Sequence, residues 1–548
     1  MIKPWVLAGE KPSDLAEYER LMRDNSGDMA FSRTLLNSLG PENTLKLSNS
    51  LNDLAYFDDT KGKQSYLTAS SGLATSLATA TRVPEFMGPM DSKGMRKPLR
   101  YGTPEYMTAF QDWKRTTDAS FYNEWVADLD KYGDDKYDLK VAGDKIQIGN
   151  GQDQQVRGYQ SLVTLMQQGE GFSPNFVADI TDNMIATERK DPDIWDLRGS
   201  YSGEEDGWFA NDPVDGALGV MARNPEGAAS FLDPGTTDGK ERFNYLLGTG
   251  EDARDWEVVD TREYRKVETT GPDIEDPDTR AGVGAALTAA ATGVDPSNPR
   301  GSFVEHTAEN DRVFQYSLEY LSKQSDDMPA SLREDMAKIM TNHGHEVYVA
   351  MSDPSETREP THGPKLDARQ VMEMTKQISR SQESYGMLHE GMNYAILEDF
   401  HDSSRKPEDT LSSAGYAVGF MEEARYNALK GDQRDYTWDK AWSYHGSGAL
   451  LNFIPVFGDI AQRGADAVTT ALIMDEQQRQ AEKLTSDNQE TYHTRKNQLN
   501  ALAEQWHSIN SGWAESHEGY SREDGMYKKI GAAANDGNKL ADGISGEH

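Results

Sequence analysis

The chain has 548 residues, of which 56 are basic and 92 acidic, so its formal net charge at pH 7 is −36. Nucleic-acid binding and adhesion to anionic membranes both need clustered lysine and arginine, and this charge argues against both. The sequence has no cysteine, which excludes disulfides, thiolate nucleophiles and cysteine-ligated zinc. Its length predicts more than one domain, because single hydrophobic cores stop growing at roughly 250–300 residues.

The N-terminal segment lacks the apolar core of a cleavable signal peptide, because Pro4, Glu10 and Lys11 interrupt it. We therefore expect a protein that is cytoplasmic, or exported by a non-classical route without a cleavable signal peptide. Leucines at helical spacing on both sides of Gly40-Pro41 then predict an αα-hairpin.

A longer helix is predicted to begin after Thr103, a favourable N-cap followed by proline. Aromatic and leucine side chains at helical spacing predict its buried face: Tyr106, Phe110, Trp113, Phe121, Trp125 and Leu129. Beyond this helix, residues 137–149 alternate around Gly143-Asp144. This pattern predicts a small β-hairpin with its turn at those two residues.

Helical patterns continue through residues 217–231, with a break at Asn224-Pro225, and through 281–291, 304–321 and 331–351. The polar, proline-rich segment 352–365 predicts a linker. We therefore expect four regions: an N-terminal helical domain (1–136), a central helical region with the hairpin and acidic loops (137–351), the linker (352–365) and a C-terminal helical domain (366–548).

The C-terminal region predicts helices over 368–378, 386–401 and 410–429. From Asp459 to about His507 it has one glycine and no proline, which predicts one long polar helix. Such a helix needs a neighbouring helix to be stable. The predicted fold class is therefore mainly α, in a multi-domain protein with a small β-hairpin and a long C-terminal helix in a helical hairpin or bundle.

Candidate metal ligands are few. His343, His345 and Glu346 lie within four residues but cannot all face one side of a helix, and Glu398 and His401 have the Glu-x-x-His spacing of di-iron bundles without a second copy. Nucleophile elbows, phosphate loops and dinucleotide fingerprints are absent from the sequence. We expect no catalytic, metal or cofactor site, and the balance favours a non-enzymatic protein.

The most apolar run of the chain is residues 446–459, which is too short to span a bilayer as a helix and contains Pro455. It predicts either a buried turn between two helices or a surface for a partner or membrane interface. The candidate surface residues are Leu450, Phe453, Ile454, Phe457, Asp459 and Arg463.

The run FIPVFGD (453–459) resembles the segment that precedes the toxin domain in bacterial polymorphic toxins. The patterns at 414–425, 442–445 and 462–464, and more weakly at 31–51, are similar to large, mostly uncharacterised actinobacterial helical proteins linked to type VII secretion. The resemblance implies a helical hairpin related to small Trp-x-Gly secreted proteins. It also implies a Tyr-x-x-x-Asp export signal, which Tyr520 and Asp524 match, with Trp513 upstream.

These observations predict a non-enzymatic interaction or scaffold protein that is a type VII-like secretion substrate. Its expected partner is a protein, either a secretion component or a small helical protein, with no nucleic acid and no integral membrane insertion. Two alternatives remain open. One is a metal-dependent hydrolase with an unrecognised site that uses Glu398, His401, His343 or His345, and the other is a membrane-active, toxin-like protein that uses residues 446–459.

Overall fold

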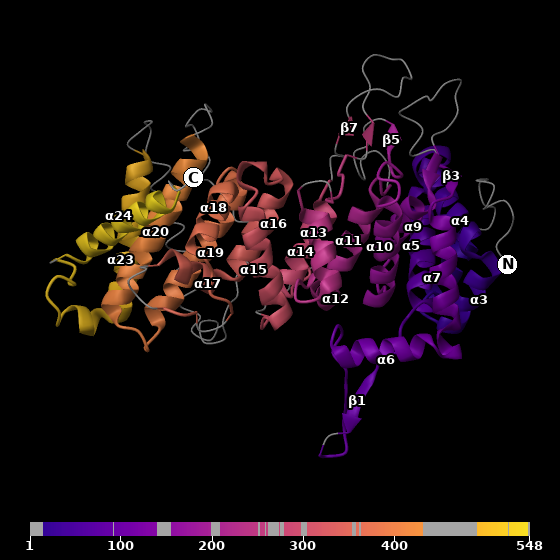
Figure 1. The fold of residues 1–548 in the computed structure, drawn as a ribbon, viewed down its shortest axis with the longest axis horizontal. Helices are drawn as coiled ribbons and strands as arrows, with labels where there is room; N and C mark the ends of the chain where they lie inside the picture. Colours follow the sequence, from indigo (N-terminus) through magenta and orange to yellow (C-terminus); the bar gives the residue numbers. More distant parts are fainter. Residues whose placement is uncertain are drawn as a thin grey trace, which may run out of the picture. The chain divides into compact units, whose positions relative to one another are not determined.

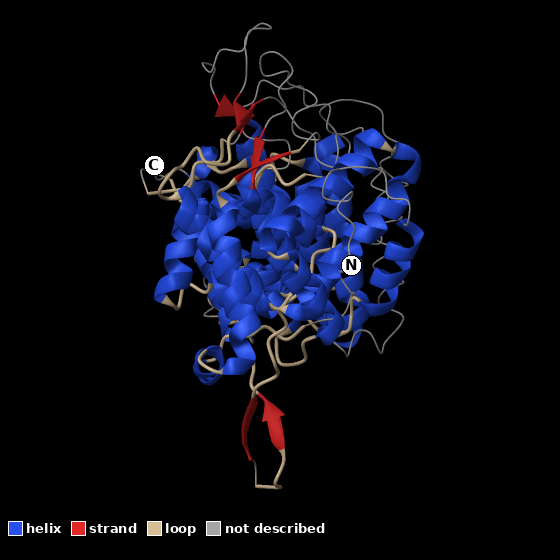
Figure 2. Ribbon diagram, turned by 90° about the vertical axis from the view of Figure 1, so that its right-hand side faces the viewer, coloured by secondary structure: helices blue, strands red, loops and turns tan. Residues whose placement is uncertain are grey.

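The computed structural model describes residues 15–90, 92–139, 155–198, 209–249, 252–257, 259–260, 273–274, 279–297, 304–352, 358–360, 363–430, 490–523 and 525–545. Contacts divide the chain into two compact units. Unit 1 holds residues 1–232 and 236–290, and unit 2 holds residues 233–235 and 291–548. Helices dominate the described parts of both units, which confirms the predicted mainly α, multi-domain fold (Figures 1 and 2).

Unit 1 is built from short helices whose leucine, valine and phenylalanine side chains form its core, among them Leu36, Leu45, Leu73, Val163 and Phe176, each at most 1% exposed. Helix α5 contacts α2, α3 and α4, and α11 contacts α9 and α10. The helices of this unit are α2 (Leu15–Asn25), α3 (Met29–Leu39), α4 (Pro41–Asp53), α5 (Lys63–Ala80), α6 (Pro104–Lys114), α7 (Ser120–Gly133), α9 (Gly158–Gln167), α10 (Pro174–Glu188), α11 (Pro213–Ala222), α12 (Pro225–Leu232), α13 (Thr237–Leu247) and the first part of α14 (Ala281–Thr292).

The strands of unit 1 are two to four residues long and form three small sheets among the described residues. Two sheets are antiparallel pairs, β1 (Met87–Met90) with β2 (Arg96–Pro98) and β3 (Lys136–Asp138) with β4 (Gln155–Arg157). The third has β6 (Val259–Asp260) between β5 (Leu197–Arg198), which is parallel to it, and β7 (Asp273–Ile274), which is antiparallel.

The predicted αα-hairpin is present as α3 and α4. Asp28 caps α3 because its carboxylate accepts a hydrogen bond from the Phe31 N–H at 2.7 Å. Gly40 ends the helix at a φ of 73°, a left-handed conformation that favours glycine, and Pro41 begins the next helix.

The predicted long aromatic helix is two helices. Thr103 caps α6 as expected, but α6 ends at Lys114, Thr116 is extended, and α7 begins at Ser120 after a 3₁₀ turn (Thr117–Ala119). Two threonines and an aspartate in succession disfavour a continuous helix, because their side chains compete for the backbone or restrict it. The aromatic side chains still pack together across the break, with Trp113 and Tyr122 ring centroids 5.4 Å apart.

The predicted hairpin at 137–149 is described only in its first strand. Tyr137 lies in β3, and its partner is Val156 of β4, outside the predicted hairpin. The expected turn at Gly143-Asp144 and the second predicted strand lie outside the described residues. The hairpin β1–β2 was not predicted.

Unit 2 is helical throughout its described residues, with a core that includes Leu318, Met336, Ile339, Val347, Leu388, Phe420 and Trp506, each fully buried. Helix α19 contacts α16, α17 and α20, and α20 contacts α18, α23 and α24. Its helices are the end of α14, α15 (Ala308–Ser322), the 3₁₀ turns Ser325–Asp327 and Ala330–Leu332, α16 (Arg333–Asn342), α17 (Gly344–Met351), α18 (Ala368–Ile378), α19 (Gln382–His401), α20 (Pro407–Lys430), α23 (Glu490–Ala514) and α24 (Met526–Ser545).

One prediction for unit 2 is wrong, because the predicted helix 331–351 is broken at His343, which connects α16 to α17. The predicted domain boundaries, with a linker at 352–365, stay a prediction; contacts divide the chain between residues 290 and 291. Arg358, from within the predicted linker, forms a 2.8 Å ion pair with the buried Asp399 of α19, so this segment is anchored on unit 2.

The predicted long helix from Asp459 is described from Glu490 onward, where α23 continues to Ala514 with a kink at Asn510. It lies against α19, α20 and α24, as its polar sequence requires. Among the described residues, we find no helix with the length and apolar character needed to cross a membrane.

Candidate functional site

The six residues expected to form a partner surface, from Leu450 to Arg463, lie outside the described residues, as does Asp524. Their roles stay predictions. Trp513 and Tyr520 are described, and they lie where α23 ends and the chain turns toward α24.

An aromatic cluster fills this turn. Trp513 stacks on His517 with ring centroids 3.9 Å apart, and it meets Tyr520 at 5.0 Å. Trp506, fully buried, lies 6.1 Å from Trp513 and donates a 2.8 Å hydrogen bond to the carbonyl of Pro407. The contacts of Trp513 and Tyr520 therefore hold the turn between α23 and α24.

The structure brings together some of the candidate metal ligands. His343 and Glu346 face each other with 3.9 Å between Nδ1 and Oε1, and His306, from the segment before α15, joins them. Burial and the neighbouring His343 lower the pKa of His306 to about 4. Burial and the Glu346 carboxylate raise the pKa of Glu398 to about 8. His345 and His401 are not part of this group of possible ligands.

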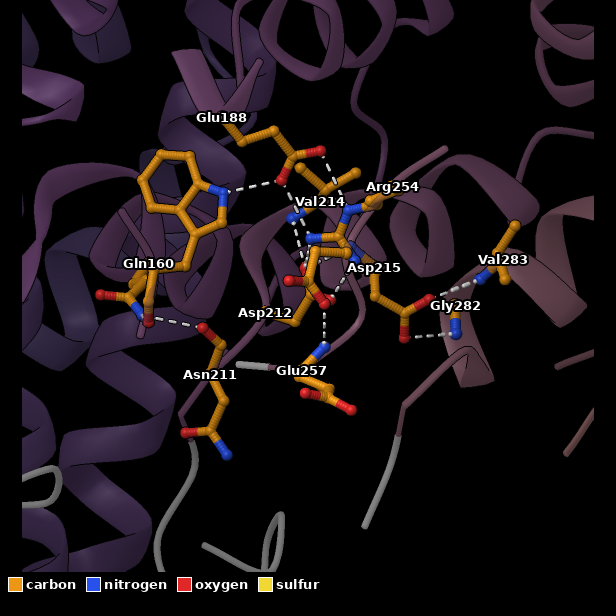
Figure 3. A network of polar contacts seen from close by, with 12 residues as sticks. Gln160, Glu188, Asn211, Asp212, Val214, Asp215, Arg254, Glu257, Gly282 and Val283 are labelled. Carbon is orange, nitrogen blue, oxygen red and sulfur yellow. Dashed lines mark hydrogen bonds and ion pairs between the residues drawn. The ribbon is translucent and has the colours of Figure 1, made fainter. Parts of the chain in front are cut away.

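A second buried polar group lies in unit 1 (Figure 3). Arg254 donates hydrogen bonds to both oxygens of Glu188 on α10, at 2.9 and 3.0 Å, and to both oxygens of Asp212 before α11, at 2.6 and 2.8 Å. Its guanidinium also lies over the ring of Trp256, 4.3 Å from the centroid. The side chains of these three charged residues are 2–3% exposed.

The remaining groups of this cluster also have partners. Asp212 caps α11 by accepting from the N–H of Val214 and Asp215 at 3.0 Å. Asp215 in turn accepts from the N–H of Gly282 and Val283 at 2.8 Å, at the beginning of α14 (Figure 3). Burial and the nearby Asp212 raise the pKa of Asp215 to about 8. Because its carboxylates are buried and already bonded, this network ties α10, α11 and α14 together rather than presenting an acid or base to a substrate.

The exposed feature of unit 1 is the hairpin β1–β2, which projects beyond α6 (Figures 1 and 2). Its base is anchored by Phe86, whose ring meets Tyr106 of α6 edge-on at 5.2 Å and whose carbonyl accepts from the Leu99 N–H at 2.7 Å. Gly94 adopts a φ of 77° close to the tip, as a tight turn requires.

Methionines cover this hairpin. Met87, Met90 and Met95 are 43, 65 and 57% exposed, and Met107 on α6 is 38% exposed. These four belong to the seven large hydrophobic side chains that are exposed among the described residues, the others being Leu21, Val304 and Tyr426. Grouped exposed methionines are typical of surfaces that adapt to a binding partner.

The hairpin also differs in charge from the rest of the chain. Residues 82–100 include five basic side chains (Arg82, Lys93, Arg96, Lys97 and Arg100) and two acidic ones (Glu85 and Asp91), in a chain with an overall excess of acid. This local cationic, methionine-rich composition is a signal that the sequence analysis missed. Its short strands and prolines concealed the hairpin, because β1 and β2 have only four and three residues.

A pocket of about 330 Å³ lies in unit 2 between Arg312 and Lys365. Its cations are already paired, Arg312 with Asp233 at 2.7 Å and Lys365 with Glu359 at 2.7 Å. The pocket therefore has no unpaired charge of its own with which to select an anionic ligand.

Comparison with known proteins gives no family for this chain. No protein-family model matches it, and no curated protein matches it. Among solved structures, the chain is similar to a crystal structure of an engineered protein at 11% sequence identity, with 98% of each chain covered and a TM-score of 0.24.

Proposed function

We propose that the protein is a non-enzymatic interaction protein that docks a partner through the β1–β2 hairpin. The observation that supports this is the exposure of Met87, Met90 and Met95 on a projecting, cationic element of an acidic chain. The partner is a small helical protein with an acidic, amphipathic face. Its apolar side chains contact the methionines, and its carboxylates meet Arg96 and Lys97.

The backbone of the hairpin favours docking by side chains over addition of a strand. Pro89 lies in β1 and Pro98 in β2, and neither has an N–H to donate. Prolines on edge strands oppose pairing with a further strand. We therefore expect the partner to place a helix, rather than a strand, against the methionines.

We also propose that the protein is a type VII-like secretion substrate. The support is the resemblance of residues 414–425, 442–445 and 462–464 to proteins linked to that system, together with the helical hairpin α23–α24 that has Trp513 at its turn. In an actinobacterial host, deleting the secretion ATPase should remove the tagged protein from the medium. Equal amounts in the medium with and without the ATPase would contradict this proposal.

Docking is tested by photo-crosslinking in the same host. A benzophenone amino acid at position 90 should give a discrete adduct with one small acidic protein, whereas the same group at Leu21, which is 37% exposed on α2, should not. The double change Arg96→Glu and Lys97→Glu should abolish the adduct, because it reverses the charge that attracts the partner.

Circular dichroism of the charge-reversed variant provides the folding control. An adduct that survives charge reversal, or adducts of equal yield at positions 90 and 21, would contradict docking at the hairpin. The hydrolase alternative named four ligands; His343 lies in a group with His306 and Glu346, and His345 and His401 are not in that group. The membrane-active alternative depends on residues 446–459, which lie outside the described residues.

A further inference from the structure

Three groups that can bind a metal ion converge in unit 2 from separate segments. His306 lies before α15, His343 connects α16 to α17, and Glu346 lies in the first turn of α17. One ligand atom from each lies within 4.8 Å of the other two. His343 and Glu346 are three residues apart at the beginning of α17, which places their side chains on the same side of the helix.

His343 has an orphaned ring nitrogen. The side chain is fully buried, and its Nε2 lies 2.9 Å from the carbonyl oxygen of Ala291. A carbonyl only accepts, so Nε2 carries the proton and Nδ1 has the free lone pair. This Nδ1 has no hydrogen-bond partner among the described residues, and the 3.9 Å to Glu346 Oε1 is too long for a hydrogen bond.

His306 is held in the same tautomer. Its Nε2 lies 2.7 Å from Oδ1 of Asn342, which accepts the proton and leaves Nδ1 as the ligand atom. The rings of His306 and His343 are 3.9 Å apart between centroids, and Phe314 stacks on His343 at 4.1 Å. Metal-bound histidines typically donate their second N–H to a carbonyl or carboxylate oxygen in this way, which fixes the ring and directs the lone pair.

The ligand atoms are too far apart for direct hydrogen bonds, 3.9 Å between His343 Nδ1 and Glu346 Oε1 and up to 4.8 Å within the group. Zinc bonds of roughly 2.0–2.2 Å place tetrahedral ligand atoms about 3.3–3.5 Å apart. Binding therefore requires the ligand atoms to move closer together and the His306 and His343 rings, whose centroids are 3.9 Å apart, to tilt away from each other. Leaving a buried nitrogen without a partner is unfavourable, and a metal ion would satisfy it.

The surroundings close the site. Asp311 on α15 has a buried carboxylate oxygen, Oδ1, without a hydrogen-bond partner among the described residues, and it interacts electrostatically with His343. The backbone of Gly363 covers Glu346 so closely that a Cβ at this position would lie 2.0 Å from Oε1. An ion at this position would therefore be enclosed by protein.

We propose that His306, His343 and Glu346 bind one Zn²⁺ ion, through the two Nδ1 atoms and a carboxylate oxygen, with a water molecule as the fourth ligand. Imidazole and carboxylate ligands in a cysteine-free chain suit zinc. The ion joins the segment before α15 to α17 and stabilises unit 2. This departs from the sequence-based expectation of no metal site, and it is independent of the hairpin.

The test uses the full chain after treatment with a chelator. Calorimetric titration with ZnCl₂ should give one Zn²⁺ per chain, and Co²⁺ in its place should give the strong visible absorption of a tetrahedral complex. Glu346→Gln, which preserves the shape of the side chain, should lose both signals. Asn342→Ala should weaken Zn²⁺ binding by about 10–100-fold, because it removes the hydrogen bond that orients His306.

His345→Gln is the matched control, since this histidine lies between two proposed ligands but outside the group. It should bind Zn²⁺ as the unaltered chain does. His306→Gln, a change at the half-buried ligand, provides a second ligand variant should Glu346→Gln fail to fold, as judged by circular dichroism. Absence of stoichiometric Zn²⁺ in the unaltered chain, or equal binding by both ligand variants, overturns the proposal.

Discussion

At the scale of single residues, the most consequential side chain in unit 1 is Arg254. It is buried and donates four hydrogen bonds to two carboxylates that are 66 and 42 residues away in sequence. A buried ion pair is not by itself strong support for stability, but removing one partner leaves uncompensated charge. The packing of α10, the beginning of α11 and the segment at 252–257 therefore depends on Arg254.

Arg254→Ala should lower the free energy of unfolding by about 3–5 kcal/mol, because Glu188 and Asp212 would remain buried without their cation. Urea denaturation followed by circular dichroism measures the change. Arg115→Ala provides the control, since Arg115 pairs with Asp112 on the surface and is 76% exposed. Its loss should change stability by less than about 1 kcal/mol, and equal effects of the two changes would contradict the assigned role.

At the scale of elements, helices α20 and α24 pack with their backbones close together. Gly415 and Gly419 of α20 face Ala533 and Ala534 of α24, and a Cβ at Gly419 would lie 1.9 Å from the carbonyl oxygen of Ala534. Small residues four apart on one helix face allow this approach.

Gly419→Ala should destabilise the protein by about 1–3 kcal/mol, because the added methyl group forces α20 and α24 apart. Gly531→Ala is the matched control on α24, where nothing lies within 4 Å of the added Cβ. That change should stabilise the helix by about 0.5–1 kcal/mol, since alanine loses less backbone entropy than glycine. The melting temperatures of both variants test this prediction. A Gly419→Ala chain that melts at the same temperature as the unaltered chain would contradict tight packing at this position.

At the scale of the whole molecule, several buried acids make stability depend on pH. Burial raises the pKa of Glu422 to about 7, although Arg495 and Arg425 oppose the shift. A folded-state pKa above the unfolded value of about 4.3 means that the protonated form is favoured in the fold. The stabilisation is complete below about pH 4 and is lost as the pH rises through 7. Asp215 and Glu398, each with a pKa raised to about 8, act in the same direction.

The chain should therefore unfold at lower urea concentration at pH 8 than at pH 5. In Glu422→Gln, which cannot ionise, this fall should be smaller by an amount on the order of 1–3 kcal/mol. Glu42→Gln is the control, because Glu42 forms an exposed surface pair with Lys46. It should leave the pH dependence unchanged. A pH profile of Glu422→Gln that matches the unaltered chain would show that Glu422 ionises normally in the fold.

Local chemistry predicted much of the fold. The cap at Thr103, the Gly40-Pro41 turn and the break at Asn224-Pro225 are signals that act within a few residues, and the structure has helix ends at each of them. The breaks near Thr116 and at His343 were missed, because neither contains a proline and helical spacing continues across them. The β1–β2 hairpin was missed because its strands are too short to show a period.

The candidate sites were harder to predict, because they join residues that are distant in sequence. His343 and Glu346 were noticed as neighbours in the sequence, but His306, which precedes α15, joins them only in the folded chain. Likewise Glu188, Asp212 and Arg254 meet only through the packing of α10, α11 and the segment at 252–257.

The sequence by itself determined the helical class, the cysteine-free and acidic chemistry, and the helix ends that depend on local capping, because each of these follows from composition or from interactions within one turn. The tertiary structure alone decided which polar side chains become buried together and which surface stays exposed. The physical reason is that burial and desolvation depend on what packs on a residue. When the residue that packs on a side chain is tens of positions away in the chain, the local sequence pattern does not reveal the contact.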